Sequence, residues 1–278
     1  MNIEFVTAMK TSTISPSTQS TYASNYKRFM KLTADKPVLL FTETALVKEL
    51  KTIEAPPMSV NGIISICMLI RKSVHLTNKK LEKYRTELVA KHYENKEISN
   101  SEVLIDKLAT INDIATYVAQ QLSARDYTSF IINFLLFKFG LRNADVNLTI
   151  VKSKAYATDD SINYIYFTTN YIVFIVNDYK TRAVYGPKKF KITSRPVINA
   201  CKILLDDEDE YKLIPASNIN AFIQSRTLNK MGSGMYFKSV VSELYRNGKK
   251  NEIRNLCASR GTNVTTCEKE YTIDLTEN

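Results

Sequence analysis

The chain has 278 residues, of which 44% are hydrophobic and 24% charged, a balance typical of a globular protein with one large or two smaller domains. Its formal net charge is +10, from 38 Lys and Arg against 28 Asp and Glu. A division after Val103 gives 15 basic and 10 acidic residues before it and 23 and 18 after it, so each part carries +5. An excess shared in this way favours a polyanion as the partner, with an anionic membrane surface as the rival.

Several classes of protein are disfavoured by what the sequence lacks. No apolar run reaches the ~20 residues of a membrane-spanning helix, and no secretory signal is recognisable. The four cysteines form no CxxC pair and there are two histidines, so we expect no metal site, no disulfide framework and no cofactor. High Lys, Ile and Asn usage suits the AT-rich genome of a mobile element or large DNA virus. The expected location is therefore intracellular, in host cytoplasm or nucleus, or in a virion.

The first 103 residues are predicted to form a small helical domain. Residues 1–14 are interpreted as a weakly anchored lead-in, and Ser15 followed by Pro16 is typical of a helix start. Apolar residues spaced by three and four predict helices at about 16–30, 42–50, 63–72 and 78–93. The polar stretch 94–102 is interpreted as a linker to a second domain, residues 104–278.

The second domain is organised around residues 127–150. Apolar residues recur at helical spacing from Tyr127 to Phe139, and Gly140 can take the positive φ of a helix C-terminus. Arg142 then lies at the start of a predicted break between two helices. Asp145 follows three residues later, at a spacing that would let it orient the arginine.

The periodicity changes beyond this point and predicts a small antiparallel sheet. Alternation from Ile162 to Tyr166 and the β-branched run 171–176 predict two strands joined by a turn at 168–170. Lys180 lies in the next turn, before a third strand at 188–193. Helices are predicted after Pro196, at 237–245 and at 253–258. The fold class is therefore mainly α with a small antiparallel sheet (α+β).

This order of elements resembles the tyrosine recombinase (phage-integrase) family over nearly the whole chain. The resemblance rests on a helical bundle, a linker, a helix ending in Gly140-Leu141-Arg142, strands with Lys180 in a turn, and Tyr271 near the C-terminus. It implies a core-binding domain followed by a catalytic domain. In this family a tyrosine hydroxyl attacks a DNA phosphodiester, forms a 3′-phosphotyrosyl link and frees a 5′-hydroxyl.

Carried over by position, the resemblance implies four catalytic residues. Arg142 matches the first phosphate-clamping arginine, Lys180 the lysine acid and Tyr271 the nucleophile. Lys238 falls where the family has the arginine of its His-x-x-Arg box, 33 residues before the tyrosine (271 − 238). The competing placement, at Arg254, leaves 17 residues (271 − 254), and Arg254 and Arg260 are kept as alternatives.

The catalytic part departs from the family pattern at two boxes. Met235 stands for the histidine of the second box, and Cys257 or Ala258 falls at the third-box His or Trp. The chain has no tryptophan and no histidine after His92, so no alignment restores these groups. Loss of an oxyanion donor costs ~10²–10³ in rate and loss of an acid–base ~10²–10⁴.

Three functions therefore stay open. The first is a recombinase-like protein that cleaves and rejoins DNA; the second is a pseudoenzyme of the same fold with a structural or regulatory role on DNA; the third is a protein scaffold without DNA. For the first two we expect a homodimer or homotetramer on duplex DNA. The expected DNA-binding residues besides the catalytic set are Lys79, Lys80, Lys83, Arg182 and Arg254.

Overall fold

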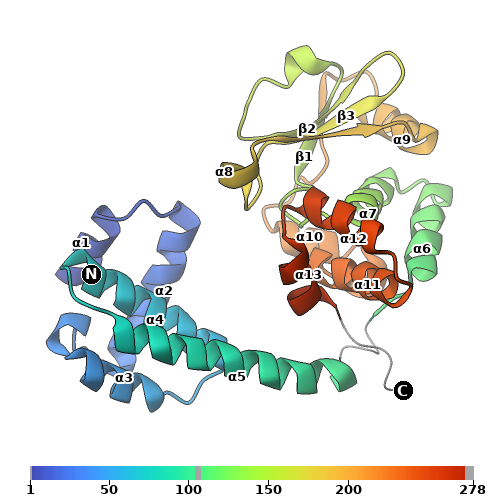
Figure 1. Cartoon of the computed structure of the whole chain (residues 1–278). Helices are drawn as coiled ribbons and strands as arrows, with labels where there is room; N and C mark the ends of the chain where they lie inside the picture. Colours follow the sequence, from blue (N-terminus) through green and yellow to red (C-terminus); the bar gives the residue numbers. More distant parts are fainter. Residues whose placement is uncertain (1, 104–107, 273–278) are drawn as a thin grey trace. The chain divides into compact units, whose positions relative to one another are not determined.

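The computed structural model describes residues 2–103 and 108–272. It is mostly helical, and its described strands form one small sheet, which confirms the predicted α+β class. The chain divides into two compact units, residues 1–99 and 100–278. The boundary predicted after Val103 falls four residues further along. Figure 1 shows the elements of both units, and each unit is described by itself.

The N-terminal unit is helical, and its first helix was not predicted. Residues 3–10 form a helix that buries Phe5 and Ala8, so the interpretation of 1–14 as a weakly anchored lead-in is wrong. The unpredicted anchor is Glu4, whose carboxylate accepts hydrogen bonds from the Tyr26 hydroxyl (2.8 Å) and the Val38 backbone N–H (2.7 Å). The elements of this unit are α1 (Ile3–Lys10), α2 (Pro16–Leu32), η1 (Val38–Leu40), α3 (Glu43–Lys51), α4 (Pro57–Ser73) and α5 (Lys79–Val103).

The predicted linker at 94–102 is also wrong as a conformation, because α5 continues through it to Val103.

The helices α2 and α3 begin directly after residues whose side chains cap them. Ser15 accepts from the Thr18 backbone N–H with Pro16 in the first turn, and Thr42 caps α3 in the same way. Such side chains satisfy N–H groups that the first turn of a helix leaves unpaired.

The strands of the C-terminal unit make one mixed sheet in the order β4-β3-β2-β1-β5. The β2–β3 and β3–β4 pairs are antiparallel as expected; β1 and β5 were not predicted, and β1 lies antiparallel to β5 but parallel to β2, with Leu148 opposite Asn163. The segment after Arg142 is therefore a turn and a strand, not the second helix that we predicted; its alternating Val146, Leu148 and Ile150 fit a buried strand. The strands are β1 (Leu148–Val151), β2 (Asn163–Phe167), β3 (Ile172–Val176), β4 (Lys188–Ile192) and β5 (Glu210–Lys212).

Helices form a layer beside this sheet (Figure 1). The buried face of α7 joins the core that also contains Ile165 and Phe174 of the sheet. Asn133 of α7 is fully buried, and its side chain accepts a hydrogen bond from the Tyr236 hydroxyl at 2.6 Å. The helices and turns are η3 (Lys154–Tyr156), α6 (Ile111–Ser123), α7 (Tyr127–Phe139), α8 (Arg182–Tyr185), α9 (Arg195–Leu205), α10 (Ile219–Gln224), η4 (Leu228–Lys230), α11 (Ser233–Arg246), α12 (Lys250–Arg260) and α13 (Val264–Tyr271).

Candidate functional site

The C-terminal ends of α7 and α12 exchange arginines. Each helix ends at a glycine with positive φ, Gly140 (61°) and Gly261 (68°), as helix C-termini often do. Arg260 Nη1 donates to the backbone oxygens of Gly140 (2.7 Å) and Leu141 (3.0 Å). In return, Arg142 Nη1 donates to the backbone oxygen of Arg260 (2.5 Å). Arg260, the last residue of α12, thus caps the end of α7, and Arg142, which follows α7, caps the end of α12.

Thr181 of the β3–β4 connection and Lys188 at the start of β4 complete the cap on α12. Lys188 Nζ donates to the backbone oxygens of Ala258 (3.0 Å) and Ser259 (2.8 Å), and Thr181 Oγ1 donates to that of Gly261 (3.1 Å). The last carbonyls of a helix lack intrahelical partners and carry the negative end of its dipole, so cations are stabilised there. This arrangement brings the lysine of the sheet next to Arg142.

Arg260 is buried beneath this cluster. Its side chain is 3% exposed, and its guanidinium carbon lies 4.4 Å from the ring centre of Phe237 and 5.1 Å from that of Tyr271. The two rings meet edge to face, with centres 5.0 Å apart. Burial lowers the pKa of Arg260, an effect that the Tyr271 hydroxyl opposes. Arg260 therefore links the predicted nucleophile to the end of α7.

Asp145 brings a carboxylate to these cations. It is 2% exposed, and its Oδ2 accepts a hydrogen bond from the Arg142 backbone N–H (2.9 Å), not from the guanidinium as the sequence suggested. Its Oδ1 has no hydrogen-bond partner among the described residues. Burial raises the pKa of Asp145, against the opposing effects of that hydrogen bond and of Arg142, Arg260 and Lys188. Asp145 fixes the turn that presents Arg142.

Lys188 has a pKa well below that of an ordinary lysine. The pKa of Lys188 is lowered to about 8, mainly by burial and in smaller part by nearby Arg142, while Asp145 opposes the shift. A lysine with a pKa near 8 can give up a proton close to neutral pH, which is the property of a general acid.

The structure brings two of the four predicted catalytic residues into this cluster, Arg142 directly and Tyr271 through Arg260. Lys180 is exposed in the turn after β3, one residue before Thr181. Lys238 is half-buried on α11, directly after Phe237.

The predicted DNA-binding residues lie elsewhere on the two units. In the C-terminal unit, Arg182 Nη1 donates to the Asp160 backbone oxygen (2.8 Å), and Arg254 is exposed on α12. In the N-terminal unit, Lys79, Lys80 and Lys83 are exposed on the first turns of α5. Lys80 Nζ is also hydrogen-bonded to Thr44 Oγ1 (2.6 Å).

Sequence reasoning missed Lys188 and placed Arg260 among the alternatives. Lys188, Phe190 and Ile192 share one face of β4, and the latter two are packed against the core. A lysine in register with core residues is therefore the signal that identifies Lys188. For Arg260 the signal is the Gly261 that follows it, which marks a helix end like Gly140.

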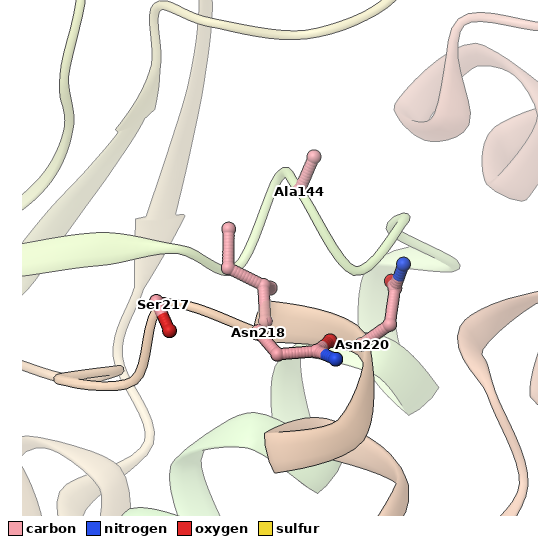
Figure 2. A pocket seen from close by; sticks show the side chains of 5 residues that line it. Ala144, Ser217, Asn218 and Asn220 are labelled. Carbon is pink, nitrogen blue, oxygen red and sulfur yellow. The ribbon is translucent and has the colours of Figure 1, made fainter.

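An open hollow of about 390 Å³ lies beside the turn that carries Arg142. Figure 2 shows the side chains of Ser217, Asn218 and Asn220 below Ala144 of that turn. Asn143 joins the two, because its Nδ2 donates to Asn220 Oδ1 at 2.8 Å. The turn is therefore fixed from both sides, by Asp145 within it and by α10.

Residues 2–103 and 108–272 show neither a metal centre nor a membrane-spanning helix. No group of three or more His, Cys, Asp or Glu side chains is placed to hold a metal ion there. Over the same residues, no helix has both the length and the apolar character needed to cross a lipid bilayer.

No protein-family profile and no curated protein matches the chain. Among solved structures, the chain is similar to one described as "Crystal structure of XerA recombinase", with 17% sequence identity and a TM-score of 0.39. The similarity covers 98% of this chain and 93% of that chain. At this TM-score it does not assign the chain to a family.

Proposed function

We propose that this chain binds duplex DNA and holds one backbone phosphate at the cluster of Arg142, Lys188 and Arg260, with Tyr271 beside it. The observation that carries the proposal is that three cationic side chains and this tyrosine, from four different elements, meet at the shared ends of α7 and α12. The order of sequence motifs supports the same conclusion independently, since it resembles tyrosine recombinases.

The three cations have different roles in this proposal. Arg142 and Lys188 are half-buried and accessible to a phosphate, whereas Arg260 is 3% exposed and acts as a positioning residue for Arg142 and Tyr271. A planar guanidinium and an ammonium on neighbouring phosphate oxygens would neutralise the charge that builds there in a transition state. Lys188 thus takes the part that the sequence resemblance gave to Lys180.

The proposed reaction is transesterification. The Tyr271 hydroxyl attacks the phosphorus, its proton passes to solvent, a 3′-phosphotyrosyl bond forms, and the 5′-oxygen leaves with a proton from Lys188. Slow turnover is expected, because the chain has no histidine after His92 to act as base. A DNA-binding protein without this chemistry is the second candidate, and the same missing histidines favour it.

A purely structural interpretation of the cluster makes a different prediction. The donors described for Arg142 and Lys188 cap the carbonyls of α12, a role that needs no ligand. If capping were their whole function, Arg142→Ala and Lys188→Met would lower the melting temperature but leave the DNA affinity of the folded protein unchanged. A phosphate site requires both to weaken binding below the melting transition.

The test is DNA binding by filter retention at ~50 mM salt and at rising salt, where each neutralised phosphate contributes about −0.9 to the log–log slope. We expect Lys188→Met to weaken binding more than Lys180→Met, and Arg142→Ala more than Arg226→Ala. Arg226 is a matched control, since its guanidinium stacks on Phe222 outside the cluster. Equal effects within each pair, in proteins shown to be folded, would remove the proposed site.

The chemistry is tested with nicked suicide duplexes that trap a covalent adduct. A low yield that disappears in Tyr271→Phe supports the enzyme. DNA binding without an adduct, even with Met235→His, Lys238→Arg and Ala258→His combined, leaves the non-catalytic candidate. Absence of DNA retention by the wild-type chain would reject both and favour the protein scaffold.

A further inference from the structure

The connection between β3 and β4 carries an exposed apolar tip. Val184 and Tyr185 of α8 are 75% and 56% exposed and adjacent, so both project from the same short turn. Figure 1 places α8 at one end of the sheet. Scattered exposed apolar residues need no explanation, but an adjacent valine and tyrosine at the tip of a connection form a small protruding wedge.

The tip is held in shape by one hydrogen bond from a buried side chain and by one within its own backbone. The Tyr179 ring is 6% exposed, and its hydroxyl donates to the Gly186 backbone oxygen at 2.6 Å. The Gly186 N–H in turn donates to the Arg182 backbone oxygen at 2.8 Å. A tip fixed in this way loses little conformational freedom when it docks.

The surroundings of the tip are cationic. Residues 178–191 contain five basic residues and one acidic residue, Asp178. Lys188 Nζ lies 5.9 Å from the Tyr185 ring centre and 4.5 Å from that of Tyr179. The tip is therefore a neighbour of the phosphate cluster, within about two base-pair rises of 3.4 Å. The basic residues are Lys180, Arg182, Lys188, Lys189 and Lys191.

We propose that Val184 and Tyr185 insert between stacked base pairs of duplex DNA beside the phosphate held by Arg142 and Lys188. The inference rests on the proposed DNA-binding function and adds how the duplex is deformed there. Apolar wedges flanked by basic residues unstack base steps in proteins that bend DNA, and every base presents a face to an aromatic ring. A lipid surface is the less suitable partner, because two side chains bury little apolar area.

The experiment measures DNA unwinding, which needs no knowledge of the target sequence. Relaxed circular plasmid is incubated with a type I topoisomerase and the full-length chain carrying Tyr271→Phe, so that the chain itself transfers no strands. After protein removal, retained negative supercoils report insertion. We expect Val184→Ala with Tyr185→Ala to lose these supercoils at least severalfold while its DNA affinity falls by less than ~tenfold, since affinity rests mainly on phosphate contacts.

The matched control is Ile203→Ala with Tyr245→Ala. It removes a similar exposed pair, 52% and 50% exposed, from α9 and α11 of the same unit. This double variant should unwind DNA as the parent does. Equal unwinding by the tip variant, or DNA binding by the parent without unwinding, would overturn the wedge and leave the proposed function intact. Absence of DNA binding by the parent would overturn both.

Two other measurements identify rival partners of the tip. Flotation with vesicles of phosphatidylserine and phosphatidylcholine that depends on Val184 and Tyr185 would assign the tip to a membrane surface and overturn insertion into DNA. Sedimentation equilibrium that showed a tip-dependent dimer without DNA would assign it to a second copy of the chain, with the same consequence.

Discussion

Replacement of Arg260 by alanine is expected to destabilise the C-terminal unit. It removes two hydrogen bonds from a charged donor to the carbonyls of Gly140 and Leu141, each worth about 1.5–3 kcal/mol. It also removes a buried charge whose Nε lacks a hydrogen-bond partner among the described residues. The desolvation cost of that charge disappears, which offsets part of the lost stability. We expect a net loss of about 2–4 kcal/mol in the free energy of unfolding, or about 5–15 °C in the melting temperature.

The assay is urea unfolding followed by circular dichroism, with Arg254→Ala as the control. Arg254 lies on the same helix but is exposed, so its removal should change stability by no more than about 0.5 kcal/mol. If Arg260→Ala were as stable as Arg254→Ala, the exchange of arginines between α7 and α12 would contribute nothing to the fold. Its role in positioning Tyr271 would then lose its basis.

Three further predictions concern glycine, a buried carboxylate and pH. Gly140→Ala should cost about 1–3 kcal/mol, because its φ is 61° and the new Cβ would lie 2.7 Å from the Phe237 ring, whereas Gly234→Ala, with open space around it, should be neutral or stabilising in the same melts. Glu4→Gln should lower the free energy of unfolding of the N-terminal unit by about 1–3 kcal/mol, since it weakens charge-assisted hydrogen bonds to three donors; an unchanged urea midpoint would contradict this. The pKa of Lys188 is about 8 in the folded chain and ordinary in the unfolded chain, so the unfolded chain binds more protons between these two values. The free energy of unfolding of the wild type should therefore rise relative to that of Lys188→Met from pH 7.5 to 10. Urea midpoints of the two proteins that run parallel over this range would refute this.

The elements that were predicted correctly are those whose pattern is local. The helix from Tyr127 to Phe139 has both a three- and four-residue apolar spacing and a glycine at its end, and the structure confirms both. The strand β2 followed from alternation and β3 from its β-branched run. The first helix was missed because its anchor, Glu4, is a buried charge whose donors lie 22 to 35 residues away.

The site was only partly predictable because its contacts join distant segments. Arg142 was found from the helix end beside it. Lys188 was passed over for Lys180, although Lys188 shares its strand face with Phe190 and Ile192, because the turn position of Lys180 fitted the family order. No local sequence pattern indicates that Lys188 donates hydrogen bonds to the backbone oxygens of Ala258 and Ser259, 70 and 71 residues away.

The exchange of arginines also has a consequence for synthesis of the chain on the ribosome. The hydrogen bonds that join the ends of α7 and α12 link residues 118 to 120 positions apart in the sequence. The end of α7 therefore stays without its cap until Arg260, 119 to 120 residues further along, has left the ribosomal exit tunnel. Tyr271 follows Arg260 by only 11 residues (271 − 260), so these two residues emerge close together. A nascent chain that ends before Arg260 therefore lacks both the cap on α7 and Tyr271.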